Sequence, residues 1–588
     1  MRQTWKLNTQ YKNCFDKKID TDLDYLHDTF VLFRKKYHKK DFTKSEKSLS
    51  KALDDYFSLF SNGAYLIPQF LLLHQSLQTN NKKLQARISV LQQKITEIFS
   101  ILDFFFPEFK NITTKKQKQF LKAKILTPYH YYLRRAFSHI EHVLTPEIET
   151  ILSTKSLPAQ SLWVQMTQDF LASKTLTYKN ETKSINEWIE LLDTYSKEDR
   201  SILWVQITDN LKEIGEAASY EMSAIYLNKK INDSLRSYST PYEATIKSYQ
   251  NDPETVQLLV DTVTKKGFEI SKDFYRTLAK DERVKQLSYT DRIISDKGLY
   301  NYSFKETFSL CRRVFSQFDT DLGAYLHLLY KNGCIDVYPR PGKRGGAFMS
   351  GVSGGNEYIF LNHTNSLSSV LTFAHEAGHA VHHYLTKKQQ PVHYQGYSTV
   401  SAETASTFFE QLVWYELYNS ASSDTEKKYL LKYRISSDVA TIMRQIAFYN
   451  FELEAHTILR NQGLLNNKQL ATLFTKHMKT YLGTAVQCSV SDGYSYVYVG
   501  HFRRMFYVYA YSYGHIASNT MLKKYIEDAN YKEYIINFLS SGQSETVETL
   551  YKMSGLDPYK KDFFENGLKT VEANLKEYKK FIASSTRK

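Results

Sequence analysis

Apolar residues recur at three- and four-residue spacing along almost the whole chain, and this periodicity limits the possible folds more than any other feature. Residues 20–37 and 86–105 are clear examples. Such spacing places apolar side chains on one face of an α-helix. The 588 residues include only 11 prolines, so few helices need to be interrupted. We therefore expect a mainly α-helical protein.

The helical pattern breaks between Cys334 and His363, a segment rich in glycine and proline. Within it, AFMSGV and EYIFLN have the composition of strands. We expect a small sheet here, immediately before a histidine-rich helix. Asn365 or Ser366 can cap that helix at its start, and Lys387, Lys388 and Pro391 mark its end.

The boundary between domains is weakly marked. The polar stretch TYKNETKSINEW precedes a new helix near residue 190. We place a boundary there, which divides the chain into an N-terminal helical lobe (residues 1–190) and a second domain (residues 191–588).

Composition excludes several classes of protein. Hydrophobic residues make up 42% of the chain, and no apolar run approaches the roughly 18–20 residues that cross a bilayer. The N-terminus lacks the apolar core of a secretory signal, so we expect a cytoplasmic protein without a membrane partner. The four cysteines are dispersed and form no CxxC pair, which predicts packing residues rather than disulfides or thiolate ligands. They are Cys14, Cys311, Cys334 and Cys488.

The net charge of +15 raises the possibility of nucleic-acid binding. However, the lysines are spread along the chain beside acidic residues, as in KSEKSLSKALDD. Dispersed charge is typical of solvated helix faces. We expect no nucleic-acid partner.

The segment LTFAHEAGHAVHHYL contains the pattern H-E-x-x-H. His375 and His379 are four residues apart, so on a helix they project from one face and can bind one zinc ion. Glu376 is placed to reach a water activated by that ion. The alternative is a histidine-rich helix with a polar edge, which the adjacent His382 and His383 favour.

A third ligand has to come from elsewhere, because residue 385 is leucine and not the histidine of an extended HExxHxxGxxH site. In the next predicted helix, residues 399–417, Glu403 stands among small residues suited to a close helix crossing. Glu410 follows two turns later on the same face. We assign Glu403 as the third ligand and Glu410 as an acceptor for the free N–H of a ligand histidine. An exposed acidic edge is the alternative for both.

The motif HEAGH, followed 24 residues after its second histidine by Glu403 in SAETASTFFE, resembles the thimet-oligopeptidase-like zinc peptidases, in particular the bacterial oligoendopeptidase F type. The stretches WKLNTQYKN, GKRGGAF, NEYIFLN and SSGQSETVETLYKMSGLD add to this resemblance. It implies a two-lobed helical bowl around a deep channel, with one zinc ion in the domain formed by residues 191–588. It also implies cleavage of short peptides.

In that family, a histidine and tyrosines beyond the zinc region help to hold the substrate carbonyl. The matching stretch here is GHFRRMFYVYAYSYGH, in which His501 and Tyr507 match the family residues. The second tyrosine is either Tyr511 or Tyr513. Without the resemblance, the stretch could be an amphipathic aromatic segment of the core.

The chain departs from commoner versions of the family at Ala377, where many relatives carry a bulkier residue, and at Arg503 and Arg504, where relatives are often aromatic or polar. None of these three positions is a proposed ligand. The two arginines bear on peptide preference.

These features predict a zinc-dependent endopeptidase that hydrolyses short peptides by attack of a zinc-activated water. Glu376 would be the general base and then the proton donor to the leaving amine, and His501 and Tyr507 would stabilise the oxyanion. The alternatives are a peptide-binding protein that keeps the fold without catalysis, and a basic nucleic-acid-associated protein. The sequence leaves the preferred cleavage site and the oligomeric state open.

Overall fold

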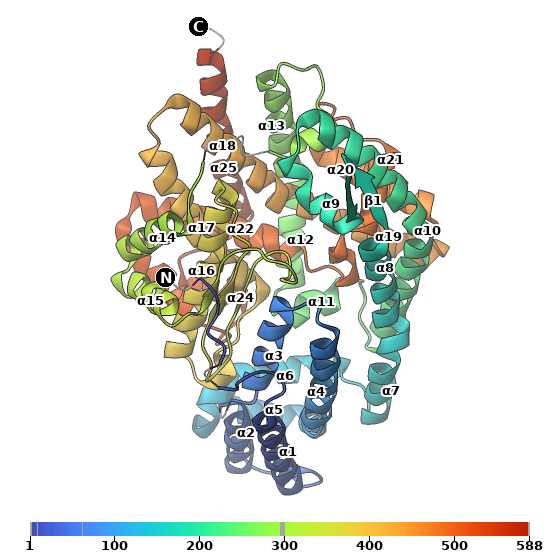
Figure 1. Cartoon of the computed structure of the whole chain (residues 1–588). Coiled ribbons are helices and arrows are strands. Elements are labelled where there is room, and N and C mark those ends of the chain that lie inside the picture. The colour runs from blue at the N-terminus through green and yellow to red at the C-terminus, as the bar shows by residue number, and fades with distance from the viewer. Residues whose placement is uncertain (1–2, 9, 62, 295–299, 586–588) are drawn as a thin grey trace. The chain divides into compact units, whose positions relative to one another are not determined.

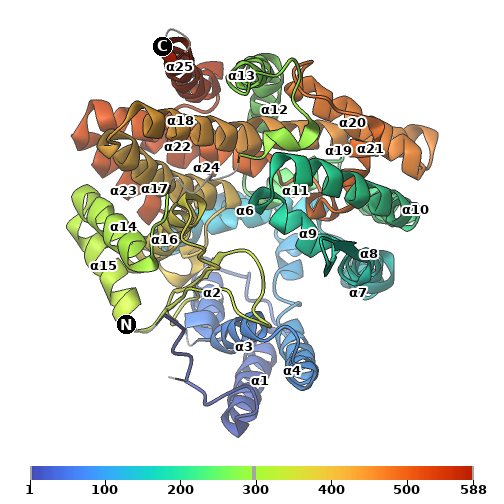
Figure 2. The same ribbon diagram turned by 45° about the horizontal axis from the view of Figure 1, so that its top comes forward.

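The computed structural model describes residues 3–8, 10–61, 63–294 and 300–585, and it is mainly α-helical, as predicted (Figures 1 and 2). The described strands form one sheet of two strands and one of three. None of the described helices combines the length and the apolar character needed to cross a lipid bilayer.

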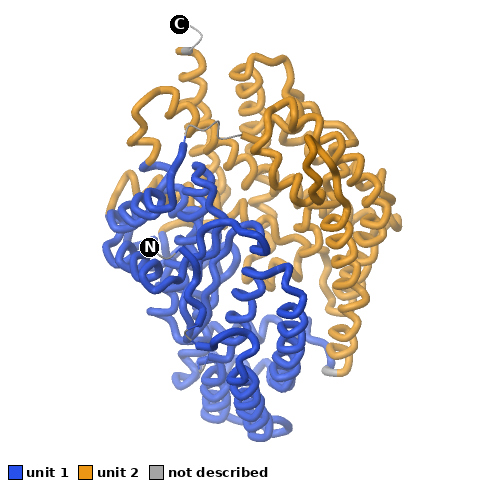
Figure 3. Tube along the Cα trace, in the orientation of Figure 1, with its two compact units in different colours: residues 1–146, 300–416, 530–554 blue, residues 147–299, 417–529, 555–588 orange. Residues whose placement is uncertain are grey.

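The chain forms two compact units that alternate along the sequence (Figure 3). Unit 1 contains residues 1–146, 300–416 and 530–554, and unit 2 contains residues 147–299, 417–529 and 555–588. The division at residue 190 and the two-lobed bowl with its channel stay predictions.

Unit 1 holds the three-stranded sheet and the histidine-rich helix. Its strands are β3 (Ile335–Asp336), β4 (Phe348–Ser350) and β5 (Tyr358–Phe360). Its helices are α1 (Lys17–Tyr37), α2 (Glu46–Ser61), α3 (Leu66–Leu77), α4 (Lys82–Ser100), α5 (Thr114–Phe120), α6 (His130–His139), α14 (Phe304–Phe318), α15 (Thr320–Lys331), α16 (Leu367–Gln389), α17 (Thr399–Ser420, whose last residues belong to unit 2), α23 (Lys532–Ser540) and α24 (Val547–Met553).

Unit 2 is helical apart from one hairpin of β1 (Thr175–Tyr178) and β2 (Glu181–Ser184). Its helices are α7 (Pro146–Ser156), α8 (Leu162–Ser173), α9 (Ile185–Leu191), α10 (Lys197–Leu235), α11 (Glu243–Ser248), α12 (Pro253–Thr262), α13 (Phe268–Asp281), α18 (Asp424–Asp438), α19 (Arg444–Gln462), α20 (Asn467–Leu482), α21 (Val490–Gly493), α22 (Tyr509–Glu527) and α25 (Lys561–Ser585).

The sheet predicted before the histidine-rich helix is present in unit 1. Its strand order is β3-β5-β4, with β3 parallel and β4 antiparallel to β5. Trp5 fastens the N-terminal segment to it, because the indole N–H lies 3.0 Å from the carbonyl oxygens of both Cys334 and Ile359. The ring also packs against Phe360, with ring centroids 5.4 Å apart. These contacts attach the N-terminal segment to the sheet that precedes α16.

Helix α16 begins where the sequence indicates. Ser366 is its N-cap, and the hydroxyl of Ser366 accepts the backbone N–H of Ser369 at 3.2 Å. The apolar side of α16 packs into the core of unit 1, where Phe373 lies 5.4 Å from Phe304 between ring centroids. A core of this kind holds the polar side of the helix in one orientation.

All four cysteines lie among the described residues, and each is buried and free of a disulfide. They occupy separate places in the cores of the two units. The prediction that they are packing residues is confirmed.

Candidate metal centre and active site

Helices α16 and α17 approach each other closely at Gly378. A methyl group added to Gly378 would lie 2.8 Å from Cα of Ser406, which is backbone and cannot turn aside. The small residues that surround Glu403 in the sequence therefore meet the glycine of HEAGH. This crossing brings the functional side chains of the two helices together.

His375, His379 and Glu403 converge at this crossing. Each offers one ligand atom, and these atoms all lie within 4.8 Å of one another. Nε2 of His375 is 3.8 Å from a carboxylate oxygen of Glu403, and the two imidazole rings are nearly perpendicular, at 86°. All three side chains are partly exposed, so the cluster is accessible to a ligand.

Glu410 binds the other side of His375. Its carboxylate oxygen lies 2.9 Å from Nδ1 of His375, so it accepts the N–H there and leaves Nε2 directed at Glu403 and His379. A hydrogen bond of this kind fixes the tautomer and the ring orientation of a metal-binding histidine. The hydrogen bond expected between Glu410 and a histidine of the motif is present, and its part in metal binding stays a prediction.

Glu376 points from the same turn of α16 and is 7% exposed. Its Oε2 atom has no hydrogen-bond partner in the described part of the chain. Burial raises the pKa of Glu376 to about 7. The carboxyl group can therefore both accept and release a proton near neutral pH.

The cluster fits a zinc ion. Two imidazoles and one carboxylate are a common donor set of catalytic zinc, and at bond lengths of about 2.0–2.2 Å tetrahedral donors stand roughly 3.4 Å apart. The distance of 3.8 Å between Nε2 of His375 and the carboxylate oxygen of Glu403 is close to this value. Burial raises the pKa of Glu403 as well, and the charge of a cation would offset that cost.

His382 and His383 do not extend the cluster. The ring of His382 is 1% exposed and stacks on Tyr397, with centroids 4.1 Å apart. Nδ1 of His383 hydrogen-bonds Glu357 at 2.7 Å. These two histidines therefore help to pack α16 within unit 1, and they are separate from the cluster formed by His375 and His379.

Glu357 is a residue whose importance the sequence did not reveal. It precedes β5, is 5% exposed, and also accepts hydrogen bonds from Lys387 and Tyr325 at 2.7 Å each. Burial alone would raise its pKa, but His383 and Lys387 hold the pKa at about 2. Glu357 thereby ties the sheet to the end of the helix that carries the cluster.

His501, Tyr507 and Tyr511 form a second polar group, in unit 2. Nδ1 of His501 hydrogen-bonds the hydroxyl of Tyr507, and the hydroxyl of Tyr511 donates to that of Tyr507 at 3.5 Å. Burial lowers the pKa of His501 to about 4, aided by Arg444 and Arg504, so the imidazole is neutral at pH 7. Tyr513 instead packs against Phe563 and Phe564 in the core.

The neutral imidazole leaves one donor free in either tautomer. When Nδ1 carries the proton, it donates to Tyr507, whose own O–H is then available to a ligand. When Nε2 carries it, Tyr507 donates to Nδ1 and the Nε2–H group is available. The pair can therefore present one donor to a carbonyl oxygen.

The backbone between His501 and Tyr507 is strained. Met505 and Phe506 have φ of 46° and 58°, consecutive left-handed values that non-glycine residues seldom adopt. Each such residue costs of the order of 1–3 kcal/mol, and this kind of strain is concentrated at functional sites. The turn directs Tyr507 back toward His501.

The two arginines of this stretch differ. Arg503 is buried and forms a bidentate ion pair with Glu221, at 2.9 and 2.7 Å. Its charge is thus paired inside unit 2, and the expectation that it bears on peptide preference stays a prediction. Arg504 is exposed, and its guanidinium lies 6.0 Å from the centre of the Tyr507 ring.

Known proteins are similar to this chain in both sequence and fold. Residues 191–570 match the model of peptidase family M3, and residues 108–173 match that of oligopeptidase F. The oligopeptidase PepF of Bacillus subtilis is 24% identical over 502 residues, which cover 83% of this chain and 74% of that protein.

Two crystal structures have the same fold. One, of a protein from Chlamydophila abortus, has a TM-score of 0.81 at 21% identity and covers 98% of both chains. The other, of oligoendopeptidase-F from Enterococcus faecium, has a TM-score of 0.73 at 18% identity and covers 97% of this chain and 99% of that one. Since the family model spans well over half of the sequence, the chain belongs to peptidase family M3 and is a metallopeptidase.

Proposed function

We propose that the protein is a zinc endopeptidase of short peptides, with one zinc ion held by His375, His379 and Glu403. The observation that carries the proposal is the convergence of these three ligand atoms within 4.8 Å. The hydrogen bond from His375 to Glu410 supports it, because it leaves Nε2 of His375 free to bind the ion. The names of the relatives, oligopeptidase and oligoendopeptidase, favour peptides as substrates.

Glu376 is the general base in this proposal. A zinc ion bound beside it would polarise a water molecule and the scissile carbonyl group. Oε2 of Glu376 takes the proton of the attacking water, which is the role that suits a buried carboxylate with no other hydrogen-bond partner on that atom. The same carboxyl group then passes the proton to the leaving amine.

His501 and Tyr507 stabilise the negative charge that develops on the carbonyl oxygen. A donor aimed at that oxygen acts more strongly on the transition state than on the substrate. The proposal is supported by the hydrogen-bonded pair itself, which keeps one donor free in either tautomer. Tyr511 donates to Tyr507 and so makes the Tyr507 hydroxyl a better donor.

Digestion of a ladder of peptides of increasing length, followed by mass spectrometry, tests this function. We expect internal cleavage of short peptides, no cleavage of folded proteins, loss of activity with a chelator and recovery with one equivalent of zinc. Cleavage that survives complete removal of metal would overturn the proposal. A protein that binds the peptides without cleaving them would instead be the non-catalytic binding protein.

A further inference from the structure

The strained turn at Met505 and Phe506 is held by one buried side chain. Glu452 lies on α19, is fully buried, and its Oε1 atom accepts the backbone N–H of Phe506 at 3.0 Å. The turn has little freedom to relax while this bond is present, because the bond fixes the amide of its second left-handed residue.

The surroundings of Glu452 offer it little else. His456, one turn further along α19, stacks on Tyr226 with centroids 3.7 Å apart and lies 4.9 Å from the Phe506 ring. Within the described residues, neither ring nitrogen of His456 nor Oε2 of Glu452 has a hydrogen-bond partner. Phe506 is therefore the one backbone partner found for a carboxyl group that is costly to bury.

Burial raises the pKa of Glu452 to about 8, against smaller lowering effects from the Phe506 N–H and from Lys229. The group is thus mostly protonated at neutral pH. Its carbonyl oxygen can still accept the Phe506 N–H in that state, and an amide oxygen could do the same.

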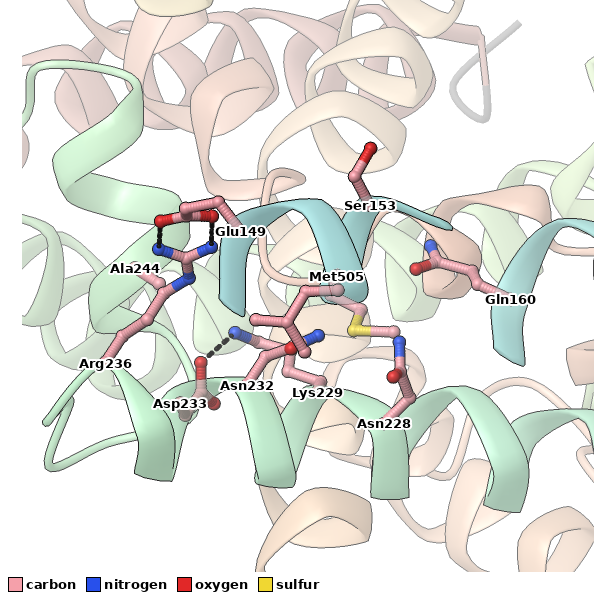
Figure 4. Close-up of a pocket in the computed structure, with 11 residues that line it drawn as sticks. Glu149, Ser153, Gln160, Asn228, Lys229, Asn232, Asp233, Arg236, Ala244 and Met505 are labelled. Atoms are coloured by element: carbon pink, nitrogen blue, oxygen red, sulfur yellow. Dashed lines mark hydrogen bonds and ion pairs between the residues drawn. The ribbon is translucent and has the colours of Figure 1, made fainter. Parts of the chain in front are cut away.

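One residue of the turn borders a cavity. Met505 lines a cavity of about 420 Å³ together with Lys229, Asn232 and other residues of α10 (Figure 4). Lys229 forms an ion pair with Asp233 at 2.9 Å, so its charge in the cavity wall already has a partner. The Phe506 side chain is fully buried, so its packing and its backbone hydrogen bond hold the turn together.

We propose that Glu452 is a positioning residue for catalysis: through the N–H of Phe506 it holds the left-handed turn that sets the Tyr507 hydroxyl against Nδ1 of His501. The inference rests on the proposed role of Tyr507 in stabilising the oxyanion. Glu452 touches neither His501 nor a substrate in this proposal, and it acts only through the backbone of the turn.

Three variants test this on the full-length, zinc-loaded protein. Glu452→Met keeps the length of the side chain but removes the acceptor, and Glu452→Gln keeps an acceptor. Glu454→Gln is the matched control, because Glu454 lies on the same helix and pairs with Lys476 and His477 away from the turn.

We expect Glu452→Met to lower kcat by about 10- to 100-fold, as a misplaced catalytic group does, with KM and zinc content unchanged. The kcat of Glu452→Gln should stay within about threefold of the parent value, and the kcat of Glu454→Gln should equal the parent value. A purely structural role predicts a lower melting temperature for Glu452→Met and a normal kcat per folded molecule, and this result would overturn the inference.

A double-mutant comparison with Tyr507→Phe gives a sharper test. In the Tyr507→Phe background, adding Glu452→Met should slow the enzyme no further, because the donor that Glu452 positions is already gone. Full additivity of the two losses would contradict the inference. If Glu452→Met does not fold, Glu452→Asp draws the carboxyl group back by one methylene and gives the same test.

A measurement without turnover separates this inference from the proposed function. A fluorotyrosine placed at position 507 should change its ¹⁹F chemical shift in Glu452→Met and keep it in Glu452→Gln and Glu454→Gln. A parent protein that cleaves no peptide would defeat the proposed function, whereas an unchanged ¹⁹F signal in Glu452→Met would defeat the positioning role.

Discussion

Nδ1 of His375 donates to Glu410 at 2.9 Å, while Nε2 of the same ring lies 3.8 Å from Glu403. Two carboxylates on one face of α17 thus lie on opposite sides of one imidazole. Only Glu403 shares the cluster with His379. The two glutamates therefore have separable effects on metal binding.

Glu403→Ala should lose zinc, as should His375→Ala and His379→Ala, because three protein ligands hold a catalytic ion. Glu410→Ala should keep a zinc site and weaken its affinity about 10- to 100-fold, the usual effect of losing a hydrogen-bond partner of a ligand histidine. Competition with a chromophoric chelator measures both. Full zinc occupancy in Glu403→Ala would move the assignment of the third ligand to Glu410.

Glu376→Gln should keep zinc and lose turnover. The amide has nearly the same shape but cannot take a proton, so kcat should fall by at least about 100-fold. Metal analysis and hydrolysis of a quenched peptide give the two values on one sample. Turnover close to that of the parent would show that another group is the base.

Tyr507→Phe should lower kcat and kcat/KM together, by roughly 100- to 1000-fold, with KM and zinc content little changed. The ring is kept, so a role in packing alone predicts a normal rate. Tyr511→Phe should have a smaller effect because its hydroxyl acts through Tyr507. Tyr513→Phe is the control, since Tyr513 packs in the core.

Substitution of His501 identifies the tautomer. If Tyr507 supplies the free donor, His501→Asn should lower kcat less than Tyr507→Phe does. If Nε2–H of His501 supplies it, the order should be reversed. Equal and normal rates in both variants would remove this pair from the mechanism.

Glu357 makes the stability of the protein depend on pH. Its pKa is about 2 in the folded state, below the ordinary value of 4.5, so its contribution is complete above about pH 4.5 and is lost as the pH falls toward 2. At one pKa unit per 1.36 kcal/mol, the contribution at pH 7 is about 3 kcal/mol.

Urea unfolding of metal-stripped protein between pH 3 and pH 7 checks this. Glu357→Gln should be less stable at pH 7 and should approach the parent as the pH falls. Glu416→Gln, which breaks a surface ion pair with Arg313, should change the profile little. A constant difference at every pH would show that Glu357 acts by packing and not by its charge.

Gly378→Ala tests the crossing of α16 and α17. The added methyl group meets the backbone of Ser406, so we expect a loss of about 1–3 kcal/mol in the free energy of unfolding. Zinc affinity should fall as well, because the ligands lie on the two helices that are forced apart. Normal zinc affinity would show that the ligand geometry does not depend on this contact.

The convergence of His375, His379 and Glu403 could be predicted from the sequence because helical spacing determines most of it. His379 comes four positions after His375 and Glu410 seven positions after Glu403, and each interval brings both side chains to one face of a helix. The small residues around Glu403 indicated a close crossing, which Gly378 provides. These are local patterns, and they survive in the folded protein.

Contacts between distant segments could not be predicted in this way. The bond from His383 to Glu357 joins a helix to the residue before a strand, and the pair of Arg503 and Glu221 spans 282 residues. Arginines are usually exposed, so a sequence alone predicts an exposed side chain. Only the structure reveals the buried partner of Arg503. The left-handed turn at Met505 and Phe506 also has no glycine to mark it.

The alternation of the two units along the chain sets an order for synthesis. Helix α16 hydrogen-bonds the α23 segment of unit 1, from Thr386 to the carbonyl of Leu539 and from Gln390 to that of Ser540. The ribosome translates the intervening residues 417–529 of unit 2 before it reaches that segment. A nascent chain with all three proposed zinc ligands outside the exit tunnel thus still lacks the segment that supports the end of α16, and until that segment emerges the end of the helix stays uncovered.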